Sequence, residues 1–229
     1  MTGFAEKYRL LCERTRRKLD SGSGGHDFDH TLRVLANARM LAQALPEADL
    51  RIVETAALLH DIARPEEMAA AGKICHAELG AETAAVWLEE LEFPAPFAAA
   101  VAGAVRSHRY RDETVPATIE AKIVYDADKL DSLGAVGLGR AFLFAGRVGA
   151  RLHNTEAEAL NSPAYSREDT AYREYLVKLR KLPGAMLTEP GRREGQRRLR
   201  FMRRFFDRLD AEIRAANAAF PPERGESVL

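Results

Sequence analysis

The sequence predicts an all-α protein, because helical signals run along nearly the whole chain and strand signals are almost absent. Apolar residues recur at intervals of three and four residues, and the good helix formers Ala, Leu, Arg and Glu dominate the composition. The length of 229 residues fits one large domain or a domain with a helical extension, and no internal repeat is present. We therefore expect a single domain over residues 1–229, with a core at about 26–135 and a C-terminal helical extension at about 136–220.

Breaks at Gly and Pro divide the first part of the chain into helices. The Gly/Ser-rich stretch Ser21–Gly25 is too short to link domains and is expected to form a lip. Asp27 or Asp29 is the expected N-cap of the second helix, Pro46 stops it, and Pro65 closes the third helix, which is apolar on nearly every side. The expected helices are about Phe4–Asp20, His30–Leu45 and Asp49–Ala63.

The second part of the chain predicts further helices. Gly134 stands where a C-terminal cap is expected. The segment Asn154–Asp169 contains Asn, Ser and Pro and is interpreted as a loop, and Pro221–Leu229 as a frayed tail. The expected helices are about Ala77–Leu91, Pro96–His108, Thr118–Leu133, Leu138–Ala150, Thr170–Lys181 and Glu189–Phe220.

The bulk composition indicates a soluble globular protein. Hydrophobic residues make up 46% of the chain and charged residues 30%. The 34 Lys and Arg residues balance the 34 Asp and Glu residues, so no net field favours nucleic acid or a membrane as a partner. Cys12 and Cys75 have no metal-type spacing, and neither a secretory signal nor an apolar run long enough to span a bilayer is found. We therefore expect a cytoplasmic protein.

Histidine and aspartate residues gather in four short segments. His60-Asp61 ends the apolar third helix, where burial of a carboxylate without a partner would cost several kcal/mol. One bound cation would satisfy both side chains. His30 lies on the apolar face of its own helix, and Asp128 follows buried-type residues, so both should point inward. The four segments are His26–His30, His60-Asp61, Cys75-His76 and Asp126–Asp131.

The two imidazoles and two carboxylates of His30, His60, Asp61 and Asp128 predict a divalent-metal site. Such mixed ligands suit Mn, our first choice, as well as Fe, Co, Ni or Zn, whereas Mg is less at ease with imidazole. The absence of cysteine from the set disfavours a closed structural zinc site. Four protein ligands on a six-coordinate ion leave positions for water and for a phosphate oxygen.

Each of these residues also has an ordinary interpretation. An inward histidine is more often a satisfied core residue, and a His-Asp pair can cap a helix end. A helical aspartate usually pairs with Arg or Lys. The joint occurrence of all four residues in this order favours the metal site.

The order His30, His60-Asp61, Asp128 resembles the H…HD…D signature of the HD superfamily of metal-dependent phosphohydrolases. Residues 26–34 resemble the opening helix of the small bacterial HD-domain hydrolases, and residues 126–134 resemble their closing motif. Lys178-Leu179, the turn 186–188 and residues 198–206 also look like the C-terminal helices of that subgroup. The resemblance covers nearly the whole chain and implies a single HD-domain-like helical bundle with additional C-terminal helices.

Some members of this subgroup are similar to nucleoside-triphosphate pyrophosphohydrolases, which release pyrophosphate and a nucleoside monophosphate. The resemblance implies a hydrolase of a small-molecule phosphate ester, a nucleotide, with nucleoside-triphosphate pyrophosphohydrolysis as the expected reaction. We expect a metal-activated water as the nucleophile, with Asp61 and Asp128 orienting it. Such relatives often carry a histidine where this chain has Glu174, which leaves the substrate open. The alternatives are a phosphodiesterase, a 5′-nucleotidase, or a non-catalytic helical module that binds a nucleotide or a protein.

Further residues are candidates for catalysis and substrate binding. In two-metal members, histidines that resemble His76 and His108 in position ligate a second ion. We expect one ion here, because a second needs carboxylates that the sequence does not obviously offer. His76 and His108 are then expected to contact phosphate or to protonate the leaving group; alternatively, His76 caps a helix and His108 is exposed. The C-terminal helices could pair two copies in a homodimer. The expected substrate-binding residues are His26, Arg33, Lys129, Asp131, Lys178 and Lys181.

Overall fold

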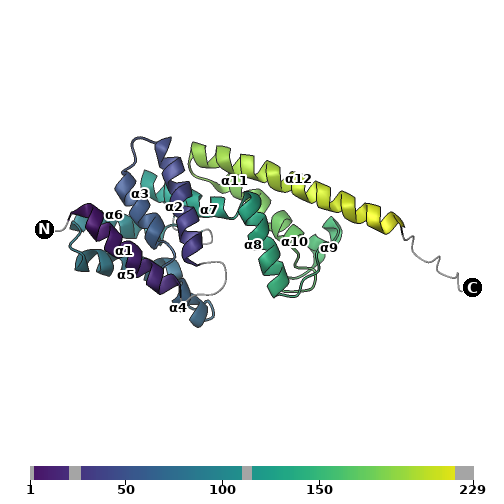
Figure 1. Ribbon diagram of the computed structural model, residues 1–229, viewed down its shortest axis with the longest axis horizontal. Helices are drawn as coiled ribbons and strands as arrows, with labels where there is room; N and C mark the ends of the chain where they lie inside the picture. Colours follow the sequence, from purple (N-terminus) through teal and green to yellow (C-terminus); the bar gives the residue numbers. More distant parts are fainter. Residues whose placement is uncertain (1–2, 21–26, 110–114, 220–229) are drawn as a thin grey trace, which may run out of the picture. The chain divides into compact units, whose positions relative to one another are not determined.

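The computed structural model describes residues 3–20, 27–109 and 115–219, and every regular element in these ranges is a helix (Figure 1). The all-α prediction is therefore confirmed. The helices are α1 (Phe4–Leu19), α2 (Phe28–Gln43), α3 (Leu50–Leu59), α4 (Arg64–Ala69), α5 (His76–Glu90), α6 (Ala95–Arg106), α7 (Ile119–Asp131), α8 (Gly134–Arg147), α9 (Glu156–Asn161), α10 (Ala171–Val177), the 3-10 helix η1 (Leu179–Lys181), α11 (Leu182–Ala185) and α12 (Glu189–Ala219).

The chain divides into two compact units. The first contains Met1–Ser132 together with Leu182–Gly195, and the second contains Leu133–Lys181 together with Gln196–Leu229. The first unit thus includes α1 to α7, α11 and the beginning of α12. Every residue predicted to bind metal lies in this first unit.

Helix α3 lies at the centre of the first unit and packs against α2, α6, α7 and α1. Its apolar side chains are buried from Val53 onward, whereas Leu50 at its start is 47% exposed. Because α3 is fixed on several sides, the residues that follow its C-terminal end, His60 and Asp61, are held in the interior. The buried residues of this segment are Val53, Ala56, Ala57, Leu58, Leu59 and Ile62.

The end of α3 differs from the sequence-based prediction. The helix stops at Leu59, and residues 60–63 form turns before α4. Pro65 does not close a helix: it lies in the first turn of α4, where the missing N–H of proline costs nothing. The earlier stop lets the chain turn away immediately after the His-Asp pair.

The segment 154–169, interpreted as a loop, contains the short helix α9. Thr155 and Glu158 form a reciprocal capping box at its start, a pattern that the sequence carries and that predicts a helix N-terminus. The expected helix 170–181 is instead divided into α10 and η1, and α8 begins at Gly134, before the expected start at Leu138. Gly134 is therefore not the C-terminal cap that the sequence predicted: Ser132 caps α7, and Gly134, with a positive φ of 76°, is the first residue of α8.

The second unit, described by itself, is organised around aromatic side chains. Phe206 of α12 lies 5.2 Å from Tyr172 and 4.8 Å from Tyr175 of α10, measured between ring centroids. Phe142 of α8 joins this cluster through Phe205 and Phe206. Among the described residues of both units, no helix is long and apolar enough to cross a membrane.

The start of α12 is attached to α7 through Asp126, which is completely buried. The Asp126 carboxylate accepts hydrogen bonds from the backbone N–H of Leu187, at 2.8 Å, and from the backbone N–H and hydroxyl of Thr188, at 2.8 and 2.6 Å. These donors include groups at a helix N-terminus, which favours negative charge. A Cβ atom at Gly191 would lie only 2.2 Å from Asp126 Oδ2, so the close approach requires glycine.

We predict that Gly191→Ala destabilises the protein by about 1–3 kcal/mol, because the added methyl group forces the helix and the buried carboxylate apart. The drop in melting temperature measures this effect. Gly103→Ala is the matched control, since Gly103 is exposed in α6 of the same unit and a Cβ there meets nothing within 4 Å. Equal melting temperatures for Gly191→Ala and the wild type would contradict the prediction.

Candidate metal centre

Helix ends orient two of the four buried histidines. His60 follows the last residue of α3, and its Nδ1 lies 2.8 Å from the carbonyl oxygen of Ala57. His108 follows α6 in the same way, with its Nδ1 2.6 Å from the carbonyl oxygen of Val105. Carbonyl groups in the last turn of a helix lack intrahelical donors, so each ring satisfies one of them. In both residues Nε2 is left to point away from the helix.

Helix starts and buried acids orient the other two histidines. His30 lies in the first turn of α2, where its backbone N–H donates to the capping carboxylate of Asp27, and its Nδ1 lies 2.7 Å from Asp131 Oδ2. Asp27, one of the two predicted caps, is therefore the observed one. His76 is the first residue of α5, and its Nδ1 lies 2.9 Å from Glu67 Oε2.

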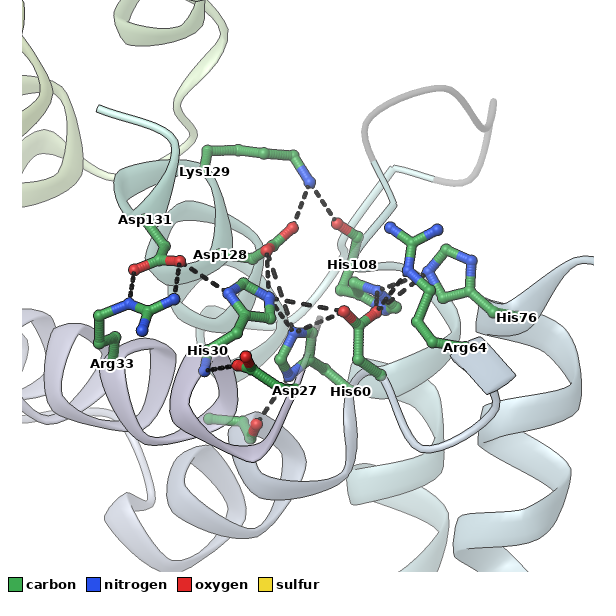
Figure 2. A network of polar contacts seen from close by, with 12 residues as sticks. Asp27, His30, Arg33, His60, Arg64, His76, His108, Asp128, Lys129 and Asp131 are labelled. Carbon is green, nitrogen blue, oxygen red and sulfur yellow. Dashed lines mark hydrogen bonds and ion pairs between the residues drawn. The ribbon is translucent and has the colours of Figure 1, made fainter. Parts of the chain in front are cut away.

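His30, His60 and Asp128 come together as one group (Figure 2). Asp61 joins this group through contacts of its Oδ2 with both histidines. The Nε2 atoms of the two histidines are 3.2 Å apart. Asp61 Oδ2 lies 3.5 Å from His30 Nε2 and 3.6 Å from His60 Nε2, and Asp128 Oδ1 lies 3.5 and 3.9 Å from the same two atoms. The histidines and Asp61 are buried, whereas the Asp128 side chain retains 18% exposure.

A second group contains Asp61, His76 and His108. Asp61 Oδ1, the other oxygen of the shared carboxylate, lies 3.3 Å from His76 Nε2 and 3.5 Å from His108 Nε2. The two Nε2 atoms are 3.2 Å apart. Both histidines are buried, so the interpretation of His108 as an exposed residue is wrong. We expected the sequence to offer no carboxylate for a second ion. The shared carboxylate of Asp61 offers one.

The spacing of both groups fits divalent ions. Ligand atoms at about 2.1 Å from one ion lie about 3 Å apart when adjacent and about 4 Å apart when opposite. The separations of 3.2 to 3.9 Å in the first group and 3.2 to 3.5 Å in the second fall in this range. The donor set of imidazole nitrogen and carboxylate oxygen suits Mn, Fe, Co, Ni and Zn. Each group could therefore hold one ion.

The protonation states also favour metal binding. Burial lowers the pKa of His60 to about 3 and the pKa of His76 to about 4, so both rings are neutral at pH 7. Burial opposes ionisation of Asp128, but Lys129, His30 and His60 outweigh it and hold the pKa of Asp128 well below its usual value. Burial would lower the pKa of His30, but contacts with Asp128, Asp131 and Asp61 raise it to about 10.

We predict that Mn binding releases about one proton and tightens with pH. Without a cation, His30 holds a proton below a pKa of about 10, and this proton must leave before Nε2 can bind metal. The affinity should rise about tenfold per pH unit between about pH 6 and about pH 8. Calorimetric titrations in two buffers of different ionisation enthalpy count the released protons. A pH-independent affinity with no proton release would contradict the prediction.

Three predicted substrate-binding residues have partners within the centre. Arg33 Nε donates to Asp131 Oδ1 at 2.7 Å, so its guanidinium is paired with the acid that also holds His30. Lys129 is buried, and its Nζ donates at 2.8 Å to both the carbonyl oxygen of His108 and Asp128 Oδ2. Asp131 is itself buried against His30, which places it behind a candidate metal ligand.

The remaining predicted substrate-binding residues lie elsewhere. Lys178 and Lys181 belong to the second unit, where Lys178 donates to Glu174 at 2.9 Å and Lys181 is exposed. His26 lies outside the described residues. Sequence reasoning missed Arg64, whose Nε lies 3.3 Å from Asp61 Oδ1, and Glu67, which contacts His76.

Comparisons with known proteins bear on the family of this chain. A family model described as the HD domain matches residues 27–133. YpgQ of Bacillus subtilis (strain 168), described as an uncharacterized protein, is 32% identical over 212 residues, which cover 87% of this chain and 90% of YpgQ.

The chain is an HD-domain protein.

Solved structures agree with this assignment. The HD-domain protein is similar to a predicted HD superfamily hydrolase from an uncultured Thermotogales bacterium, with 32% identity, a TM-score of 0.64 and coverage of 89% of this chain and 91% of that chain. It is also similar to the crystal structure of YpgQ in complex with ADP, with 28% identity, a TM-score of 0.70 and coverage of 91% and 95%. The resemblance read from the sequence is confirmed. HD domains bind divalent metal ions, and both groups of His and Asp residues are of the kind that could hold them.

Proposed function

We propose that this HD-domain protein is a metal-dependent nucleotide phosphohydrolase, with nucleoside-triphosphate pyrophosphohydrolysis as its reaction. The observation that carries the proposal is the group formed by His30, His60, Asp61 and Asp128, four ligand-type side chains that three separate segments bring together in the first unit. The crystal structure of the related YpgQ in complex with ADP supports a nucleotide as the ligand. Mn is the metal that we propose first.

A divalent ion held by these four residues supplies Lewis acidity toward a phosphoryl oxygen and toward the attacking water. Asp61 faces both groups and orients the water. Lys129 keeps Asp128 ionised through its 2.8 Å contact. Arg64 and Arg109, whose side chains are about one quarter exposed (25% and 26%), supply positive charge to the oxygens of the phosphoryl group.

We further propose that Asp61, His76 and His108 bind a second ion, so that Asp61 bridges the two. Support comes from the 3.2 to 3.5 Å separations of their ligand atoms. A second ion held by these residues would supply further positive charge to the oxygens of a phosphoryl transfer. This proposal replaces the expectation of a single ion. A homodimer through the C-terminal helices and a cytoplasmic location stay predictions.

The test is a product assay with purified protein, Mn and a panel of nucleoside tri-, di- and monophosphates and cyclic nucleotides. Chromatography and phosphorus NMR should detect equal amounts of nucleoside monophosphate and pyrophosphate, because water breaks the bond between the α-phosphorus and the bridging oxygen, or between that oxygen and the β-phosphorus. In ¹⁸O-labelled water, the position of the label distinguishes these two attacks. Asp128→Asn, which keeps the side-chain shape, serves as the inactive reference.

Each other product would indicate another function. Release of inorganic phosphate from monophosphates would indicate a 5′-nucleotidase, and opening of cyclic nucleotides would indicate a phosphodiesterase. A protein that binds Mn but hydrolyses nothing in the panel would indicate the non-catalytic module and overturn the proposed reaction.

A further inference from the structure

Glu67 contacts the second group of possible ligands at Nδ1 of His76, whereas Asp61 contacts the same group at the Nε2 atoms of His76 and His108. Glu67 belongs to α4 and is 6% exposed. Its Oε2 lies 2.9 Å from His76 Nδ1 and accepts a hydrogen bond from Arg64 Nη1 at 2.5 Å, and its Oε1 lies 3.3 Å from Arg109 Nη1. One carboxylate therefore contacts three groups of the site.

The contact with His76 determines which ring nitrogen faces the centre. An ionised carboxylate only accepts hydrogen bonds, so the ring nitrogen that faces it must carry the hydrogen. The guanidinium groups of Arg64 and Arg109, which contact the same carboxylate, favour its ionised form. In a neutral imidazole ring, a hydrogen on Nδ1 leaves Nε2 with a free lone pair.

Asp131 forms a corresponding contact in the first group, where the geometry is that of a hydrogen bond. Asp131 Oδ2 lies 2.7 Å from Nδ1 of His30, and Asp131 also accepts from Arg33 Nε at 2.7 Å. Each group thus contains one histidine held by a buried acid, which also pairs with arginine, and one histidine held by a backbone carbonyl. A carboxylate behind a metal-binding histidine fixes the ring and raises its basicity.

We propose that Glu67 is the positioning residue of the second cation site: by holding Nδ1 of His76 it makes Nε2 a ligand atom for a divalent transition metal. The proposal rests on the metal centre of the proposed function. It assigns His76 as a metal ligand and excludes it as the proton donor to the leaving group, since a neutral ring with its hydrogen on Nδ1 has none to give at Nε2. Glu67 itself contacts neither metal nor substrate.

An ordinary ion pair would make a different prediction. If Glu67 only neutralised Arg64 and Arg109, its replacement would change stability and leave metal affinity as it was. Metal binding measured without substrate separates the two roles. Glu67→Gln keeps the size of the side chain and removes its charge, and its amide oxygen cannot accept from His76 and both arginines together.

The experiment is a calorimetric titration of metal-depleted protein with Mn, combined with elemental analysis. The wild type should bind about two ions per chain. Glu67→Gln should weaken the second ion about 10–100-fold and leave the first within about threefold, whereas Asp131→Asn should weaken the first by the same factor. Glu66→Gln is the matched control, because Glu66 occupies the same helix turn and pairs with Lys18, away from the site. Unchanged binding by Glu67→Gln would overturn the proposal.

A second measurement keeps the proposal testable if Glu67→Gln does not fold. Nitrogen-15 NMR of the wild type labelled at its six histidines distinguishes a protonated Nδ1 from a protonated Nε2, and His76→Asn identifies the signal. The metal-depleted protein should show His76 with a protonated Nδ1 and an unprotonated Nε2. The opposite tautomer would overturn the proposal.

The two proposals fail in different ways. Binding of a single Mn ion by the wild type would overturn the role of Glu67 while leaving a one-metal hydrolase intact. Binding of two ions, with the expected loss in Glu67→Gln but no hydrolysis of any nucleotide, would overturn the proposed reaction and support the positioning role.

Discussion

Asp61→Ala is expected to abolish hydrolysis and to remove tight Mn binding while leaving the protein folded. Asp61 is the one acid that contacts both groups, with Oδ2 facing His30 and His60 and Oδ1 facing His76 and His108. The loss of a metal that provides several kcal/mol of transition-state stabilisation corresponds to a rate reduction on the order of 10³-fold or more. Activity and calorimetric Mn titration measure the two effects.

The fold should survive this substitution, because the apolar core around α3 does not depend on the Asp61 carboxylate. Circular dichroism should show the same helical content as the wild type. Asp29→Ala is the matched control: Asp29 is an exposed acid in the first turn of α2, next to the site in sequence only, and its replacement should leave activity unchanged. Full activity of Asp61→Ala would refute the metal-centre assignment.

Removal of the metal by a chelator is expected to abolish activity reversibly and to lower the melting temperature of the protein. A ligand at about 100 times its dissociation constant stabilises the native state by about 2.7 kcal/mol. For a protein of this size, this corresponds to a shift of roughly 5–10 °C. Differential scanning calorimetry before chelation, after it and after addition of Mn measures the shift.

All the proposed ligands belong to the first unit, so Mn should stabilise the protein through that unit. In Asp61→Ala, chelation and addition of Mn should leave the melting temperature unchanged. Activity that persists after complete removal of divalent ions, with no change in melting temperature, would show that hydrolysis does not use a metal.

The sequence was sufficient to predict the four members of the first group because their surroundings are unusual. His60-Asp61 follows a helix that is apolar on nearly every side, where burial of a carboxylate without a partner would be costly. Helical periodicity also identified most helices, since their buried positions recur every three to four residues. The main errors fell at Pro65 and at α9, where signals for the start of a helix were present in the sequence.

Other parts of the site depend on tertiary contacts that no local pattern reveals. Glu67 stands in the run Glu66-Glu67 after a proline, which looks like an exposed first turn, yet one acid is buried and its neighbour pairs with Lys18. His108 is followed by charged residues in the sequence, but its ring turns back to cap α6. Each outcome follows from the direction of the side chain relative to segments far away in sequence.

Arg33 also has a tertiary contact that no local sequence pattern reveals. Its position one turn after His30 correctly places it near the site, but the sequence does not reveal that Asp131 accepts from both residues. The phosphate-binding role expected for Arg33 was inferred from its charge and from this position, and it stays a prediction. Positive charge without a stated partner is therefore a weaker predictor than a buried carboxylate that needs one.

The attachment of Asp126 to Leu187 and Thr188 has a consequence for where this protein can be divided. The HD family match stops at residue 133, whereas the donors that satisfy this interior acid come from more than fifty residues further along. A fragment cut after Leu133 would keep every proposed ligand but lose those donors. The Asp126 carboxylate, two positions before Asp128, would then lack the hydrogen bonds that offset its burial. We therefore expect that a fragment ending at residue 133, where the family match ends, does not fold by itself. A minimal fragment has to extend through Gly195.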